Sequence, residues 1–147
     1  MTSRRSLHDN DFYAWSIEQA ALLRAGRVGE ADLATIAEEI ESMGKTEKRE
    51  LVSRLTVLVL HLLKWEHQSA ERSKSWRLSI ANARDEIADL LDDNPSLRGI
   101  TGDVMVSAYR YARRKAAIET NMAEDAFPAQ CPWNFARAMD EGFWLDG

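Results

Sequence analysis

Cysteine, proline and glycine are scarce in this 147-residue sequence, which contains one, three and seven of them respectively. The single cysteine, Cys131, excludes a disulfide within the chain and any metal site built from several cysteines. A lone thiol also suits a reducing compartment, where disulfides are rare. No apolar segment follows Arg4 and Arg5 that could act as the core of a signal peptide. Together these features predict a cytoplasmic protein.

Long hydrophobic runs are also missing. The richest run, Val57–Leu63, is interrupted by His61 and is far too short to span a bilayer, so we expect no membrane segment. Hydrophobic residues make up 45% and charged residues 29% of the chain, a balance typical of an ordinary globular protein. At this length we expect a single domain over residues 1–147, in which residues 1–8 form a flexible N-terminal arm.

What the sequence does contain is the apolar spacing of amphipathic helices. Caps and breaks predict helices that start at Asp9 or Asp11 and end at residue 25, and then over residues 30–43, 45–67, 73–93 and 103–120. Gly26 and Gly44 are expected to end the first two helices. From Leu51 to His67 apolar residues cover more than half of the helix circumference. We therefore expect an all-α fold, a compact bundle of about six helices with a long, central, buried helix.

The C-terminal third is punctuated by the three prolines. Asn94-Pro95 ends the fourth predicted helix, because proline disfavours a helical conformation in the residue before it. Pro132 is well placed to begin a short last helix that ends near Gly142. Phe143 and Trp144 are then expected to fold back as a hydrophobic tail.

Six motifs in a fixed order resemble those of a known family. They are DFYAW (Asp11–Trp15), AEEIESMGKTEKREL (Ala37–Leu51), HLLKWEHQ (His61–Gln68), RSKSWRLSI (Arg72–Ile80), DNPSL (Asp93–Leu97) and FPAQCPW (Phe127–Trp133). The family is the bacterial domain of unknown function 29, and the resemblance covers nearly the whole chain. It implies a compact all-helical domain in bacterial cytoplasm, and it implies no reaction, ligand or catalytic residue.

On the predicted central helix, polar side chains share one narrow stripe, because steps of three, four and seven residues return to nearly the same angle. They are Glu47, Glu50, Arg54, His61 and Lys64. One interpretation makes His61 a general base or metal ligand, oriented by a carboxylate from Glu50 or from the preceding helix, which carries Glu38, Glu39 and Glu41. The sequence contains no HExxH motif that would pair two histidines on one helical turn. The next histidine, His67, lies six residues after His61. A histidine satisfied by local hydrogen bonds or ion pairs is therefore the favoured interpretation.

Two segments, 64–84 and 98–115, concentrate positive charge although the chain carries a net charge of −5. Their basic residues are Lys64, Arg72, Lys74, Arg77, Arg84, Arg98, Arg110, Arg113, Arg114 and Lys115. Near Trp65 and Trp76 these residues could gather into a surface for nucleic acid or another anionic ligand. Acidic residues between Asp85 and Asp93 interrupt them, and charges on amphipathic helices usually face solvent, so nucleic acid is not the expected partner.

Cys131 precedes Pro132, the predicted start of the last helix, where the helix dipole would lower the pKa of the thiol. No histidine lies near Cys131 in the sequence to act as its base. A thiol that packs against its neighbours is the favoured interpretation.

No arrangement for nucleophilic, metal or phosphate chemistry emerges from these residues. We therefore assign no catalytic, cofactor-binding or metal-ligating residue and expect no cofactor. The favoured function is a helical protein-interaction module that binds another protein or a second copy of itself, as a homodimer. The alternatives are a binder of nucleic acid or an anionic ligand through segments 64–84 and 98–115, and an enzyme or metal site around His61.

Overall fold

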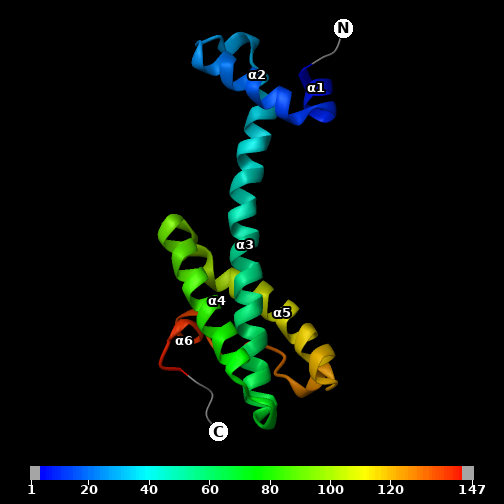
Figure 1. Ribbon diagram of the computed structural model, residues 1–147, viewed down its shortest axis with the longest axis vertical. Helices are drawn as coiled ribbons and strands as arrows, with labels where there is room; N and C mark the ends of the chain where they lie inside the picture. The colour runs from blue at the N-terminus through cyan, green and yellow to red at the C-terminus, as the bar shows by residue number, and fades with distance from the viewer. Residues whose placement is uncertain (1–3, 144–147) are drawn as a thin grey trace. The chain divides into compact units, whose positions relative to one another are not determined.

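The computed structural model describes residues 4–143, which form helices joined by short turns (Figure 1). This part of the chain contains no β-strand, so the predicted all-α fold is confirmed. The described residues group into two compact units, one up to Thr46 and the other from Glu47 onward. The single domain over residues 1–147 stays a prediction.

The first unit contains α1 (Arg4–Asn10), α2 (Phe12–Arg24), the 3₁₀ turn η1 (Val28–Glu30) and the beginning of α3 (Leu33–His67). Asp11 caps α2, because its carboxylate accepts a hydrogen bond of 3.0 Å from the Ala14 N–H. Gly26 follows α2 with a φ of 74° and ends it as predicted. Gln19 of α2 accepts a 2.7 Å hydrogen bond from the Asp32 N–H, which ties α2 to the start of α3.

The arm predicted over residues 1–8 is helical from Arg4 onward, and residues 1–3 lie outside the described residues. His8 of α1 is held by partners elsewhere in the unit. Its Nε2 lies 2.6 Å from Oε1 of Glu39, and its ring packs edge-on against Trp15 with 4.7 Å between centroids. The contact with Glu39 joins residues 31 positions apart, and the local sequence did not predict this helix.

α3 runs without a break from Leu33 to His67, so the prediction of separate helices over residues 30–43 and 45–67 is wrong. Gly44 does not adopt the positive φ that would end a helix. The Thr46 hydroxyl donates a 3.0 Å hydrogen bond to the Ser42 carbonyl within the same stretch. Glycine costs a helix only about 1 kcal/mol relative to alanine, so Gly44 alone does not interrupt α3.

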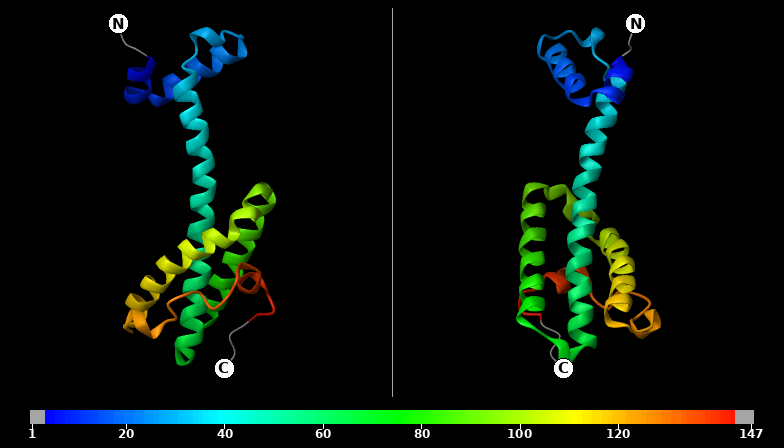
Figure 2. Two further views of the ribbon diagram at one scale, coloured as in Figure 1. Left: turned by 180° about the vertical axis from the view of Figure 1, so that it is seen from behind. Right: turned by 45° about the vertical axis from the view of Figure 1, so that its right-hand side comes forward.

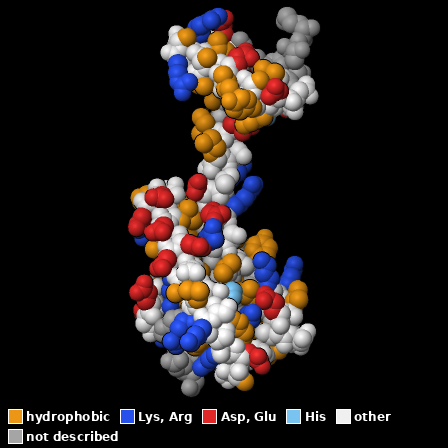
Figure 3. All heavy atoms as spheres, in the orientation of Figure 1, with side chains coloured by type: hydrophobic (Ala, Val, Ile, Leu, Met, Phe, Trp, Pro, Cys, Tyr) orange, Lys and Arg blue, Asp and Glu red, His pale blue; other side chains and the backbone are white. Residues whose placement is uncertain are grey.

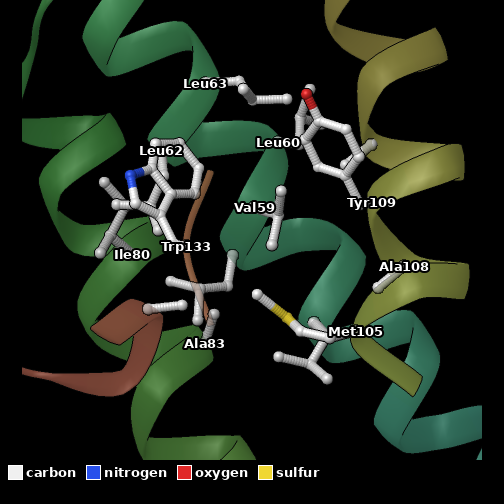
Figure 4. Close-up of a cluster of buried hydrophobic side chains, with 14 of the residues drawn as sticks. Val59, Leu60, Leu62, Leu63, Ile80, Ala83, Met105, Ala108, Tyr109 and Trp133 are labelled. Atoms are coloured by element: carbon white, nitrogen blue, oxygen red, sulfur yellow. The ribbon is translucent and has the colours of Figure 1, made fainter. Parts of the chain in front are cut away.

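The second unit packs around the C-terminal part of α3. Its other elements are η2 (Ser69–Glu71), α4 (Lys74–Asp93), η3 (Pro95–Ile100), α5 (Thr101–Thr120), η4 (Glu124–Ala126) and α6 (Phe135–Met139). α3 passes between α4 and α5 (Figures 1 and 2). Leu58 and Leu62 of α3 are fully buried, in a core that also contains Ile80 of α4 and Met105 of α5 (Figure 4). The prediction that the segment after Leu51 is central and buried is confirmed.

The ends of α4 and α5 follow from local signals. Ser73 caps α4 by accepting a 3.2 Å hydrogen bond from the Trp76 N–H, and α4 ends before Asn94-Pro95 as predicted. α5 begins at Thr101, two residues earlier than expected, because η3 leads directly into it. None of the helices in the described ranges combines the length and the apolar character needed to cross a membrane.

The predicted last helix is wrong at both ends. α6 begins after Asn134, whose side chain accepts a 2.8 Å hydrogen bond from the Arg137 N–H, and it ends at Met139 rather than near Gly142. Pro132 lies outside α6, because the side-chain cap that starts a helix is supplied by Asn134. Phe143 is buried as expected, and Trp144 lies outside the described residues.

Candidate functional site

The first unit carries a groove of about 410 Å³, lined mainly by hydrophobic side chains of α2 and of the start of α3. These side chains are Phe12, Trp15 and Leu23 of α2, and Ile36, Ile40 and Met43 of α3. We call it the α2–α3 groove. Figure 3 shows hydrophobic side chains gathered on one face of the first unit.

Helical spacing builds both walls of the α2–α3 groove, because residues three and four apart lie on one face of a helix. The side chains along its rim stay largely exposed. Phe12 is 50%, Ile40 63% and Met43 68% exposed to solvent. Clusters of large apolar side chains left in water are uncommon on soluble proteins and mark sites of interaction.

Trp15 and Gln19 also line this groove and are almost completely buried. The Gln19 carbonyl is satisfied by the Asp32 N–H, but the Gln19 amide nitrogen and the Trp15 indole nitrogen have no hydrogen-bond partner among the described residues. A buried donor without an acceptor destabilises a fold by about 1–3 kcal/mol. Two buried hydrogen-bond donors of the first unit therefore lack acceptors within the described part of the chain, whereas a well-packed core leaves few such groups.

His8 and Glu39 lie beside the α2–α3 groove, with Glu39 among the residues that line it. Glu39 accepts the hydrogen bond from His8, and Asp9 lies 3.1 Å from the other ring nitrogen. These bonds favour the charged imidazolium, so they raise the pKa of His8 above its usual value, with Glu39 contributing most. The groove thus has an ion pair, sensitive to pH, at its edge.

The second unit carries a larger groove, of about 660 Å³, between α5 and the segment that follows η4. Met105, Val106, Tyr109 and Arg110 line it from α5, and Cys131 and Trp133 line it from the opposite side. We call it the α5 groove. Neither its volume nor its position was apparent from the sequence, because its two walls are some twenty residues apart along the chain.

Cys131 is half-buried in the α5 groove. Burial raises the pKa of its thiol, because a thiolate would lose contact with water, while a backbone hydrogen bond involving Trp133 opposes this shift more weakly. Since α6 begins only at Phe135, no helix start adjoins the thiol. The expectation of a lowered pKa is therefore wrong, and the thiol stays protonated at neutral pH.

His61 is not brought to the carboxylates that could have oriented it. Its Nδ1 lies 2.8 Å from the Val57 carbonyl of its own helix. Glu50 instead pairs with Arg54 at 2.7 Å, and Arg54 also reaches Glu86 of α4 at 2.8 Å. Among the described residues no group of three or more potential ligands could hold a metal ion. These contacts match those of a polar edge on a packed helix.

Many basic side chains of segments 64–84 and 98–115 are engaged within the unit. Lys64 lies 3.2 Å from Glu119 and stacks on the ring of Trp76. Arg98 pairs with Asp92 at 2.9 Å. These ion pairs neutralise positive charges that the sequence analysis assigned to a possible basic surface.

Trp65 does bring two other basic residues together. The guanidinium groups of Arg72 and Arg77 lie 5.0 Å and 5.7 Å from the centre of its ring, and Arg72 also donates a 2.8 Å hydrogen bond to the Trp65 carbonyl. Trp65 is only 6% exposed, and cation–π contacts of this kind stabilise the packing of basic side chains against its ring. The prediction that basic residues lie near Trp65 is thus confirmed for Arg72 and Arg77, which pack against its ring.

Arg84 was expected on the basic surface but is only 3% exposed. Its Nε and Nη2 donate hydrogen bonds of 2.9 Å to the carbonyls of Ala138 and Phe143, which fastens the C-terminal segment to α4. Burial lowers the pKa of its guanidinium, and the nearby Asp140 and Glu141 oppose that shift. The sequence did contain a signal, because Arg84 follows Ile80 by four residues and therefore lies in the apolar stripe of α4.

The chain matches the family described as domain of unknown function DUF29 over residues 7–144. It therefore belongs to this family, and the resemblance seen in the sequence is confirmed. No curated protein and no solved structure matches the chain. The family description names no activity.

Proposed function

We propose that this member of the DUF29 family is a protein-binding module whose α2–α3 groove receives an amphipathic helix of a partner protein. The observation that carries the proposal is the exposed apolar rim formed by Phe12, Ile40 and Met43.

A helix suits the α2–α3 groove because two neighbouring helices leave a furrow into which a third can pack. Ile36, Ile40 and Met43 follow the i, i+4, i+7 pattern with which helices pack in such contacts. Full burial of a side chain of this size is favourable by about 1.5–3 kcal/mol, and Ile40 and Met43 retain most of that surface in water. Covering these side chains with a partner helix would supply a favourable hydrophobic contribution.

The charge around the groove favours a partner helix with basic flanks. The sequence up to Thr46 contains eight Asp and Glu residues against five Lys and Arg residues. Glu38 and Glu41 are exposed on α3 next to the apolar stripe, and Glu39 lines the groove itself. Basic residues beside the apolar face of the partner would meet these carboxylates and guide its approach.

On a second copy of the chain, α5 presents an exposed apolar residue beside basic ones. On α5, Ile118 is 70% exposed and follows the exposed Arg114 and Lys115 by about one turn. Self-association through such a contact is thus included in the proposal as one source of the partner helix.

The proposed setting of this binding is the bacterial cytoplasm. The single cysteine, Cys131, is unpaired and half-buried, which suits a reducing compartment.

Selection from a library of randomised helical peptides tests the proposal. We expect the full chain to enrich peptides with apolar residues at i, i+4 and i+7 and with Lys or Arg beside them. Ile40→Asp should abolish their binding, and Leu78→Asp should not, because Leu78 is 60% exposed on α4 and lines neither groove. Equal binding to both variants would contradict the proposal.

Sedimentation velocity with the same variants tests the second copy as partner. If α5 of another chain occupies the groove, the wild type associates as its concentration rises, and Ile40→Asp remains monomeric. A wild type that stays monomeric while selected peptides still bind would leave a different protein as the partner.

A further inference from the structure

We propose that the α5 groove is a binding site for a small apolar or aromatic molecule that carries one negative charge. This inference is independent of the protein-binding groove in the first unit. Its support lies in the walls of the α5 groove, in the contacts that keep it open, and in Arg110 at its rim, which pairs with no carboxylate among the described residues.

The size and lining of the α5 groove suit a small molecule. Its volume of about 660 Å³ lies within the range typical of small-molecule sites. Met105, Tyr109 and Trp133 line it and are 5%, 4% and 9% exposed, so their side chains belong at once to the groove and to the core (Figure 4). Val106 adds an apolar side chain that is 73% exposed. An apolar ligand would cover this surface.

Specific hydrogen bonds hold the two walls of the groove together. The Tyr109 hydroxyl donates to the carbonyl of Pro128 at 2.5 Å. The Arg113 guanidinium donates to the carbonyl of Phe127 through Nε at 3.3 Å and through Nη2 at 3.1 Å. These bonds fasten the irregular segment to α5 at one end of the groove. The groove is thus formed before any ligand arrives, which lowers the cost of binding.

The charges along the rim favour an anion. Arg113 is already matched by acidic groups, with Glu124 at 3.7 Å and Asp125 at 4.0 Å. Arg110 also lines the groove and is exposed, but it forms no ion pair with a carboxylate among the described side chains. Its contacts are with Tyr111, through a 3.3 Å hydrogen bond and a cation–π stack at 5.1 Å. The Arg110 guanidinium can therefore pair with a carboxylate or sulfonate on a molecule lying in the groove.

Cys131 gives this site a direct reporter, because it lines the groove and is the only cysteine in the chain. A molecule seated against it would block its reaction with a thiol reagent. Protection of Cys131 therefore distinguishes occupation of the α5 groove from binding anywhere else on the protein.

The test uses 8-anilinonaphthalene-1-sulfonate, an aromatic probe with a single negative charge, and the full chain. We expect the probe to slow alkylation of Cys131 by iodoacetamide with the same concentration dependence as its fluorescence. Arg110→Gln should weaken this protection about tenfold, the effect of losing one moderately strong charged contact. The matched variant Arg114→Gln, an exposed arginine one turn along α5 that does not line the groove, should change it less than about twofold.

Three results would overturn the inference. They are no protection of Cys131 at saturating probe, equal effects of Arg110→Gln and Arg114→Gln, and equally tight binding of the uncharged analogue N-phenyl-1-naphthylamine. Ile40→Asp, which alters only the α2–α3 groove, should leave the protection unchanged. Failure of this inference is thereby separated from failure of the proposed protein-binding function.

Discussion

Replacing Arg84 by methionine removes a buried guanidinium while keeping most of the aliphatic stem that packs in the core. In the wild type this group donates two 2.9 Å hydrogen bonds, to the carbonyls of Ala138 and Phe143. Methionine cannot donate to either carbonyl. Because Arg84 is only 3% exposed, water does not readily take the place of the lost donors.

The expected loss in the free energy of unfolding comes from the two carbonyls that no longer have a donor. A buried acceptor left without a donor costs about 1–3 kcal/mol, so two of them give a loss of about 2–4 kcal/mol after relief of the buried charge is allowed for. Arg84→Lys should lose less, because an ammonium group can still donate to one carbonyl but does not reproduce the fork of the guanidinium.

Urea denaturation followed by circular dichroism measures these losses as changes in the free energy of unfolding. The matched control is Arg114→Met on α5, where the side chain is exposed and the expected change is within about 0.5 kcal/mol. If Arg84→Met lost less than about 1 kcal/mol, or no more than the control, the two hydrogen bonds would not be fastening the C-terminal segment.

Four further measurements address other parts of the chain. Leu62→Ala, at a fully buried site, should destabilise the protein by about 2–5 kcal/mol in chemical denaturation, and a loss below about 1 kcal/mol would contradict its central position. Burial raises the pKa of Tyr109 to about 12, so ultraviolet titration should show a late phenol step that is missing in Tyr109→Phe. Hydrogen bonds to Glu39 and then Asp9 raise the pKa of His8 above 6.5, so its contribution to stability is complete below pH 6.5 and is lost as the pH rises through the folded value. NMR titration should show the pKa of His8 falling in Glu39→Gln, and no fall would contradict this pairing. Fluorescence anisotropy should show weak binding to random duplex DNA near physiological salt, and submicromolar affinity with a steep salt dependence would reverse that expectation.

Local signals in the sequence determined much of the helical framework. The Ser73 cap and the Asn94-Pro95 break predicted α4 closely, because a cap and a proline act on the residues beside them. Gly26 marked the end of α2 in the same way. The buried face of α3 after Leu51 also followed from the sequence, since its apolar residues cover too much of the circumference to be exposed.

The tertiary structure decided the features that depend on residues distant in the sequence. Arg84 became a buried clamp because two carbonyls more than fifty residues away lie within its reach. The α5 groove and the raised pKa of Cys131 exist because a distant segment packs beside α5. Spacing along a helix specifies which side chains share a face, whereas burial, pairing and cavities depend on what is packed against that face.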